Sequence, residues 1–214
     1  ILTNQDILTI MATKNIGLES KTDTRFAYCN TNYAMLALII EKVTKRSYKD
    51  AMNTIIFKPL GMKNTFVFDY EKDKDKIVPS YKANRIEKGK DYLDAVYGDK
   101  NIYSTPRDLL KFDRARNSRT FLEPKLLSQV YKGYSNEREG KKNYGLGIRM
   151  INWETGQNFY FHNGWWHGNT SAYVTLQKEQ VTMIALSNKF TRQTYNIRKL
   201  SKLFGDYPFE TDDE

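Results

Sequence analysis

Phe159-Tyr-Phe-His-Asn-Gly-Trp-Trp-His-Gly-Asn169 is the stretch that decides the fold, and it holds both histidines and two of the three tryptophans of the chain. An aromatic run typical of a β-strand leads into it, and residues 170–176 follow as a second strand. A glycine at the end of such a strand lets a substrate approach the main chain closely. Taken alone, the stretch favours an aromatic hairpin turn whose histidines only pack, and a motif far upstream changes that interpretation.

The composition is that of a folded protein with a real core. The chain has 214 residues, of which 40% are hydrophobic and 14% aromatic, enough for one domain or one large piece of a domain. The formal net charge is +9, but residues 69–91, the densest charged stretch, carry seven basic and six acidic residues. No glycine-rich or zinc-ligand motif for nucleic acid accompanies the basic excess. We therefore expect no nucleic-acid partner, and an anionic-polymer binder remains a distant alternative.

The sequence gives little indication of a membrane span, a disulfide or a metal site. No apolar run is long enough to cross a membrane. Cys29 is the only cysteine, so no internal disulfide forms, and we expect it to be a small buried filler. One cysteine and two histidines do not fill a four-ligand zinc site. We expect neither a metal nor an organic cofactor.

The hydrophobic pattern predicts helices first and strands afterwards. A helix over residues 2–11 begins with Thr3 as its cap and Asp6 three residues later. A second helix follows residues 30–32, and Met35, Leu36, Ile39, Ile40 and Val43 form its predicted buried stripe. Further helices are expected at residues 48–57, 105–112, 124–131 and 192–204. Strands are expected at residues 65–68, 144–151, 159–162, 170–177 and 181–187, with a charged solvated loop over 69–91.

This order indicates an α+β fold in which an antiparallel sheet is flanked by helices. We expect a mainly helical part over residues 1–142, followed by the antiparallel sheet and a terminal helix over residues 143–204.

Four stretches, taken in order, carry a family resemblance. They are Phe26-Ala-Tyr-Cys-Asn-Thr-Asn-Tyr33, Phe57-Lys-Pro-Leu-Gly-Met-Lys-Asn-Thr65, Gly98-Asp-Lys-Asn-Ile-Tyr-Ser-Thr-Pro-Arg-Asp-Leu-Leu110 and His162-Asn-Gly164. The chain resembles the serine β-lactamase and penicillin-binding-protein-like hydrolases, specifically the branch of class C β-lactamases, D-alanyl-D-alanine peptidases and esterases. The resemblance extends from the first residue to about residue 204. Each motif alone is weak, but the ordered set is specific.

The resemblance implies a role for each motif residue. Tyr28 and Asn30 match the Tyr-x-Asn motif, and His162 and Gly164 match the His-x-Gly form of the third motif, whose related set is Ser-x-x-Lys, Ser-Asp-Asn and Lys-Thr-Gly. Tyr28 would move protons, Asn30 would bind the substrate carbonyl, and His162 would assist proton transfer or fix a carboxylate. The N–H of Trp165 would stabilise the oxyanion. The residues implied to bind substrate are Gly164, Trp165, Trp166 and Tyr173, the last three through an apolar aromatic pocket.

The Ser-x-x-Lys motif is missing from these 214 residues, because no serine has a lysine three residues later. We expect the chain to be the C-terminal portion of a longer hydrolase, incomplete at its N-terminus, and inactive alone. The alternative is a non-catalytic binding or sensor module on the same scaffold. The resemblance implies a small-molecule or peptide acyl substrate and a periplasmic or cell-envelope location, whereas the oligomeric state stays open.

Overall fold

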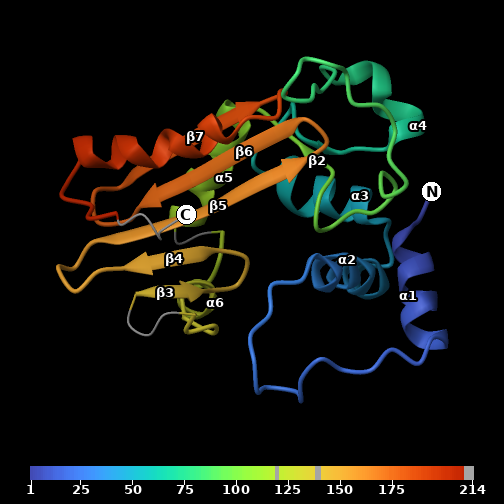
Figure 1. The fold of residues 1–214 in the computed structure, drawn as a ribbon, viewed down its shortest axis with the longest axis horizontal. Helices are drawn as coiled ribbons and strands as arrows, with labels where there is room; N and C mark the ends of the chain where they lie inside the picture. Colours follow the sequence, from blue (N-terminus) through green and yellow to red (C-terminus); the bar gives the residue numbers. More distant parts are fainter. Residues whose placement is uncertain (119–120, 138–140, 210–214) are drawn as a thin grey trace. The chain divides into compact units, whose positions relative to one another are not determined.

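The computed structural model describes residues 1–118, 121–137 and 141–209. Its helices and antiparallel strands confirm the predicted α+β fold (Figure 1). The chain divides into two compact units. The first unit comprises residues 1–79 and 87–112, and the second comprises residues 80–86 and 113–214.

The first unit begins with helix α1 (Asn4–Thr13), whose predicted start is confirmed. The Thr3 hydroxyl accepts a hydrogen bond from the Asp6 N–H at 3.2 Å, and the Asp6 carboxylate accepts one from the Thr3 N–H at 2.8 Å. This reciprocal pair satisfies two N–H groups that a helix start otherwise leaves without partners. The helix ends at Thr13, two residues beyond the predicted end.

Helix α2 (Asn30–Thr44) buries only part of the predicted stripe, in which Ile40 packs against a core cluster. Leu36, Ile39 and Val43 are 48%, 54% and 75% exposed, whereas Ala34 and Ala37 are fully buried. Small side chains let a helix backbone approach its neighbours closely, and the hydrophobic pattern gives them little weight. Asn4 shows how close this approach is, because its amide donates to the Ala34 carbonyl at 2.9 Å.

The rest of the first unit is built from short elements. Tyr48 and Phe57 belong to α3 (Tyr48–Met52) and the π-helix η1 (Asn53–Phe57), which together occupy the predicted helix at residues 48–57. They form a core cluster with Ala37, Met62 and Val67. The remaining elements are β1 (Phe66–Val67), α4 (Tyr70–Asp73), η2 (Lys74–Lys76), β2 (Ile102–Tyr103), which pairs with β1, and the beginning of α5 (Pro106–Asn117).

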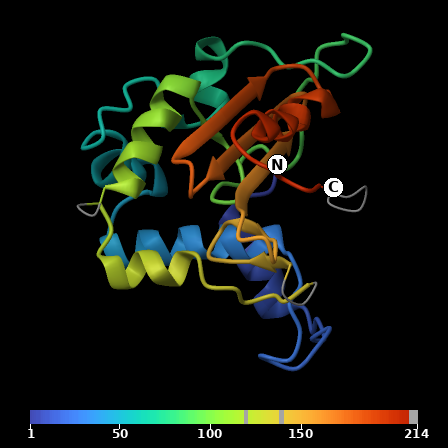
Figure 2. The same cartoon turned by 90° about the vertical axis from the view of Figure 1, so that its left-hand side faces the viewer.

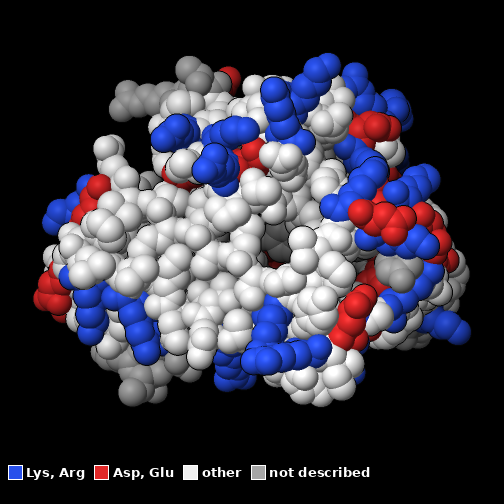
Figure 3. All heavy atoms as spheres, turned by 90° about the horizontal axis from the view of Figure 1, so that it is seen from above, with Lys and Arg blue, Asp and Glu red and all other residues white. Residues whose placement is uncertain are grey.

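The charged stretch at residues 69–91 is more ordered than the predicted solvated loop. It contains α4 and η2, and the Asp73 carboxylate is buried. Lys49 and Lys76 approach that carboxylate at 3.0 and 2.6 Å. In Figure 3, acidic and basic side chains lie side by side on the right-hand part of the surface, around α4. The near balance of charge in this stretch therefore corresponds to local ion pairing.

The second unit contains a five-stranded antiparallel sheet in the order β3-β4-β5-β6-β7. The predicted single strand at residues 144–151 is wrong, because it is a hairpin. The Gly145 N–H donates to the Ile148 carbonyl at 2.8 Å, and Gly147 has a positive φ of 77°. The strands are β3 (Lys142–Tyr144), β4 (Arg149–Asn152), β5 (Asn158–Trp166), β6 (Asn169–Leu176) and β7 (Val181–Ser187).

Helices cover both faces of this sheet (Figure 2). On one face, Phe159, Val174 and Leu176 form a core cluster with Tyr207, and the terminal helix η3 (Arg192–Leu203) packs here with 3-10 geometry. On the other face, Tyr160 stacks on Tyr131, which follows α6 (Pro124–Val130), with 5.0 Å between the ring centroids. The end of α5 also contacts this face, where Arg116 donates to the Thr175 hydroxyl. The sheet is thus a rigid layer, and β5 is its central strand.

Candidate functional site

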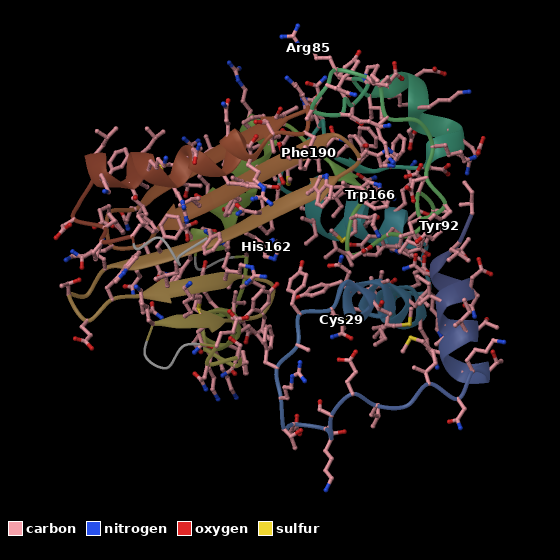
Figure 4. All side chains as sticks on the ribbon, viewed as in Figure 1. Cys29, Arg85, Tyr92, His162, Trp166 and Phe190 are labelled. Carbon is pink, nitrogen blue, oxygen red and sulfur yellow. The ribbon has the colours of Figure 1, made fainter. Side chains whose placement is uncertain are left out.

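The His-x-Gly residues lie inside strand β5, and not at a strand end as the sequence pattern had indicated. β5 continues to Trp166, and every residue from Phe159 to Trp166 has a partner on β6. His162 pairs with Tyr173, and Gly164 pairs with Ser171. Figure 4 labels His162 and, further along the same strand, Trp166. The motif is therefore held by a regular sheet and not by a turn.

Both ring nitrogens of His162 have hydrogen-bond partners. Nδ1 lies 2.8 Å from the Asn163 carbonyl oxygen, and Nε2 lies 3.0 Å from the Tyr144 hydroxyl. Burial lowers the pKa of His162, and the positive charge of Arg149 lowers it further, while the Asn163 carbonyl opposes both effects. Because its pKa lies below the ordinary histidine value of ~6.5, the imidazole is neutral at physiological pH.

The backbone N–H of Trp165 points to an open edge of β5. Where the β4–β5 turn closes, the Trp153 N–H donates to the Gln157 carbonyl at 3.1 Å. Backbone groups alternate sides along an antiparallel strand, so odd-numbered β5 residues turn theirs toward β4 and even-numbered residues turn theirs toward β6. β4 pairs with β5 only as far as Phe161, and no other described strand pairs with that edge. Asn163 and Trp165 therefore direct their N–H groups outward, where an acyl oxygen can accept.

Gly164 lies directly against the side chain of its cross-strand neighbour, Ser171. A Cβ added at this position would lie 2.3 Å from the Ser171 Oγ, far inside van der Waals contact. The sequence had suggested that this glycine makes room for a substrate. In the structure, the Ser171 hydroxyl occupies the space next to the Gly164 backbone.

The two tryptophans lead into the turn that joins β5 and β6. The Trp165 side chain is 67% exposed, and its indole N–H donates to the His167 carbonyl at 2.9 Å. The Trp166 ring meets the His167 ring edge-on at 5.0 Å. His167 has a positive φ of 55°, which histidine tolerates better than most side chains, and this identifies it as a turn residue.

A segment from far upstream in the sequence crosses this turn. Tyr81 pairs with Lys189 in a parallel bridge, and the Gly168 N–H donates to the Ser80 hydroxyl at 3.3 Å. A Cβ added at Gly168 would lie 2.2 Å from the Tyr81 carbonyl oxygen. The absence of a side chain at Gly168 therefore lets residues 80–81 pack directly on the hairpin.

Tyr173 belongs to a buried hydrogen-bond network. By register it shares a sheet face with His162. Its hydroxyl donates to the Asp113 carboxylate at 2.5 Å, which also accepts from Thr182 at 2.8 Å. Burial raises the pKa of Tyr173, and the neighbouring Asp113 adds to this effect over the opposing Arg116. The Tyr173 hydroxyl is therefore neutral, and it bonds to Asp113 within the fold.

Tyr28 and Asn30 lie in the first unit. Tyr28 is 47% exposed in the segment that precedes α2, and Asn30 is the first residue of that helix. The helix begins at Asn30, earlier than predicted; its N-cap residue is Cys29, which makes no side-chain cap bond. Cys29 is exposed and is not the buried filler that we had expected. Because Tyr28 and His162 belong to different units, their action on one substrate stays a prediction.

The described residues, 1–118, 121–137 and 141–209, carry no metal-binding group or membrane-spanning helix. No group of three or more His, Cys, Asp and Glu in this part of the chain could hold a metal ion. None of its helices is both long and apolar enough to span a bilayer. A cavity of about 440 Å³ lies in the first unit, where Tyr48, Phe68 and Tyr97 supply apolar walls beside Glu41 and Asp94. It contains none of the predicted site residues.

Comparison with known proteins decides the family. The sequence profile of the family described as Beta-lactamase matches residues 7–203, which is most of the chain. The chain belongs to this family.

Its β-lactamase-family relatives are considerably longer than 214 residues. Penicillin-binding protein 4* of Bacillus subtilis is 27% identical over 208 residues, which cover 88% of this chain and 45% of that protein. The teichoic acid D-alanine hydrolase of Staphylococcus aureus is 26% identical over 132 residues, which cover 60% and 33%. The chain thus spans less than half the length of these relatives.

Solved structures agree on the β-lactamase-like fold. The octameric penicillin-binding protein homologue from Pyrococcus abyssi superposes with a TM-score of 0.80 at 22% identity, over 95% of this chain and 48% of that one. A D-stereospecific amidohydrolase from Streptomyces superposes with a TM-score of 0.74 at 21% identity, over 93% and 60%. At this level of identity the likeness establishes the fold alone.

Sequence reasoning missed three residues that shape the surroundings of the motif. They are Tyr144 and Arg149 beside His162, and Ser171 opposite Gly164. A signal for the first two was present, because Gly145 and Gly147 mark a tight turn that brings their flanking residues together. Ser171 has no signal in sequence, since a cross-strand neighbour follows only from the register.

Proposed function

We propose that this β-lactamase-family chain supplies two of the three motifs of a serine hydrolase that opens an amide or ester through an acyl-serine intermediate. The arrangement on β5 carries the proposal. A half-buried, neutral imidazole at His162 lies two residues before Gly164, and the N–H of Trp165, the next residue, faces an open strand edge. An imidazole and an outward N–H donor on one rigid strand suit acyl transfer.

Each residue has a proposed task in the reaction. As a serine attacks the acyl carbon, negative charge collects on the carbonyl oxygen, and the Trp165 N–H donates to it. Asn30 donates its amide to the substrate carbonyl and Tyr28 relays a proton, while His162 orients the substrate or its leaving group. A phenol has a pKa near ~10, so Tyr28 needs a nearby cation before it can act as a base.

The nucleophile and this cation are proposed to come from outside the 214 residues. None of the serines present has lysine three residues later, and both a serine hydroxyl and a lysine ammonium are needed at the acyl carbon. The chain alone therefore should not form an acyl-enzyme. We regard residues 1–214 as the C-terminal part of a single hydrolase domain.

The proposed substrate is an acyl compound built on a D-amino acid. Its similar proteins include a teichoic acid D-alanine hydrolase, a D-amino acid amidase from Ochrobactrum anthropi and a β-lactamase/D-alanine carboxypeptidase from Pseudomonas syringae. The shared chemistry is an ester or amide of a small D-acyl group. A location in the bacterial cell envelope, where such groups decorate the wall, fits this proposal, and no metal or organic cofactor is required.

The test is covalent labelling by a fluorescent penicillin or a fluorophosphonate. The 214-residue chain should stay unlabelled, whereas the product of its reading frame extended upstream of Ile1 should be labelled. Replacement of the upstream serine by alanine should abolish the label, and His162→Asn should slow it by roughly 10²-fold, because the substrate loses its orientation. Labelling of the 214-residue chain itself would refute a nucleophile supplied from elsewhere.

A binding module on the same fold is the second candidate function, favoured by the missing Ser-x-x-Lys. It predicts that the upstream reading frame encodes no such motif. It also predicts reversible, saturable binding of penicillin by the intact protein, which equilibrium dialysis detects, with no covalent product.

A further inference from the structure

His162 is held from two sides by groups that differ in what they can do. The Asn163 carbonyl, 2.8 Å from Nδ1, has no proton and only accepts a hydrogen bond. Nδ1 must therefore carry the proton. In a neutral ring the other nitrogen, Nε2, then has a lone pair, and its partner at 3.0 Å is the Tyr144 hydroxyl, which can donate.

We infer that Tyr144 is a positioning residue for His162: it donates its hydroxyl proton to Nε2 and so fixes the ring as the neutral Nδ1–H tautomer. The two hydrogen bonds also restrain rotation of the ring about its Cβ–Cγ bond, because both of its nitrogens are engaged. Tyr144 meets the imidazole edge-on, with 6.0 Å between the ring centroids. The phenol therefore restrains both rotation and proton position.

The surrounding charges favour the same state. Arg149 lies over the Tyr144 ring at 5.5 Å, and its charge disfavours the imidazolium form of His162. Glu137 is 3.9 Å from the Arg149 guanidinium and offsets part of that charge. From β6, Tyr173 shares the sheet face but directs its hydroxyl to a carboxylate. Arg149 thus places a positive charge near the ring, and this charge opposes protonation.

If His162 acts in the proposed function, on which this step rests, the tautomer limits what the ring can do there. The Nε2 lone pair is directed to Tyr144, so it takes a proton from a substrate only if the Tyr144 hydroxyl turns from donor to acceptor. In that step a proton forms a bond to Nε2, the ring becomes imidazolium, and the phenol oxygen accepts the new N–H. The resting ring is a fixed, neutral hydrogen-bonding group.

The experiment is nitrogen NMR of the two histidine rings in the 214-residue chain, at about pH 8, well above the ordinary histidine pKa of ~6.5. The variant His167→Asn assigns the spectrum, since asparagine also accepts the positive φ of that turn position. We expect a protonated Nδ1 and a hydrogen-bonded, unprotonated Nε2 at His162. In Tyr144→Phe, the Nε2 signal should shift toward that of a nitrogen without a hydrogen-bond donor.

The matched control is Tyr134→Phe. Tyr134 lies beside Tyr144, since its N–H donates to the Tyr144 carbonyl, yet its own hydroxyl contacts Gln129. Its loss should leave the His162 signals in place. A protonated Nε2 in the native chain, or an Nε2 signal that Tyr144→Phe leaves unchanged, would overturn the inference.

A second measurement separates this inference from the proposed function. In the upstream-extended protein, Tyr144→Phe should slow acyl labelling by roughly tenfold or more, because a catalytic ring loses its orientation. Tyr134→Phe should not slow it. If the NMR result holds and nothing is labelled, the proposed function fails while the tautomer stands. If labelling occurs and the NMR result is contrary, the positioning role of Tyr144 fails alone.

Discussion

Replacement of Gly164 by alanine distinguishes two reasons for a glycine in the His-x-Gly motif. If the glycine only admits substrate, the alanine variant folds normally and loses function. If it accommodates Ser171, the variant loses stability, and removing the Ser171 hydroxyl restores it. The added Cβ would lie 2.3 Å from the Ser171 Oγ but 3.7 Å from its Cβ, so the clash is confined to one atom.

The expected magnitudes follow from opposing contributions. Overpacking of this kind costs roughly 1–3 kcal/mol, and rotation of the Ser171 side chain keeps the cost toward the lower end. Against this, a Gly→Ala change stabilises a compatible site by about 0.4–1 kcal/mol through the unfolded chain. Gly164→Ala should therefore lower the free energy of unfolding by about 0.5–2 kcal/mol. In a Ser171→Ala background, the same change should be neutral or stabilising.

Urea unfolding of the wild type, both single variants and the double variant measures this coupling. Ser171→Ala alone should lie within about 0.5 kcal/mol of the wild type, because no hydrogen bond of its side chain to another described residue is seen. Gly17→Ala serves as the control for the general effect, since a Cβ there would meet nothing within 4 Å. Additive free energies in the cycle would refute the cross-strand explanation of Gly164.

Three further predictions concern charge. Burial raises the pKa of Asp73, but two lysine ammonium groups and a backbone N–H outweigh it and hold that pKa at about 2. The ionised carboxylate therefore stabilises the fold by about 2 kcal/mol, and this stabilisation should be lost as pH falls from about 4 to 2. In urea unfolding, the stabilities of Asp73→Asn and the wild type should converge over that range. Arg149→Gln should raise the pKa of His162 toward its ordinary value, as an NMR titration will show, and an unchanged or lower pKa would contradict it. Asp113→Ala should cost about 3–5 kcal/mol in denaturant unfolding because it strands the buried Arg116 guanidinium, and a loss below 1 kcal/mol would contradict the network.

Much of the fold and the positions of the motifs could be predicted from the sequence. Strong local signals, such as the Thr3 cap and the mainly apolar run of residues 181–187, predicted elements that the structure confirms. The ordered motifs around Tyr28 and His162 predicted the β-lactamase family, which the family match confirms. Both successes rest on information that is local in the chain.

The failures arose where packing between distant residues decides the outcome. Large apolar side chains dominated the expected stripe on α2, yet Ala34 and Ala37 form its buried face because only small residues allow the close approach. Residues 144–151 alternate as a strand would, but Gly147 turns the chain back. The expected solvated loop instead buries Asp73 beneath two lysines. Of these three features, only the hairpin has a short sequence signature, in the two glycines Gly145 and Gly147.

The register of one hairpin determines the chemistry available on β5. With Gly164 opposite Ser171, the even-numbered residues bond to β6 and the Trp165 N–H is directed to the open edge. A slip of one residue would exchange these sets, turning the Trp165 N–H into the sheet and moving the His162 ring to the opposite face. The contact between Gly164 and Ser171 helps to exclude that slip, because a larger residue opposite the serine would force the Ser171 hydroxyl to move. The glycine of the motif therefore contributes to the site through the sheet, by keeping the imidazole and the N–H donor on the sides where acyl transfer would use them.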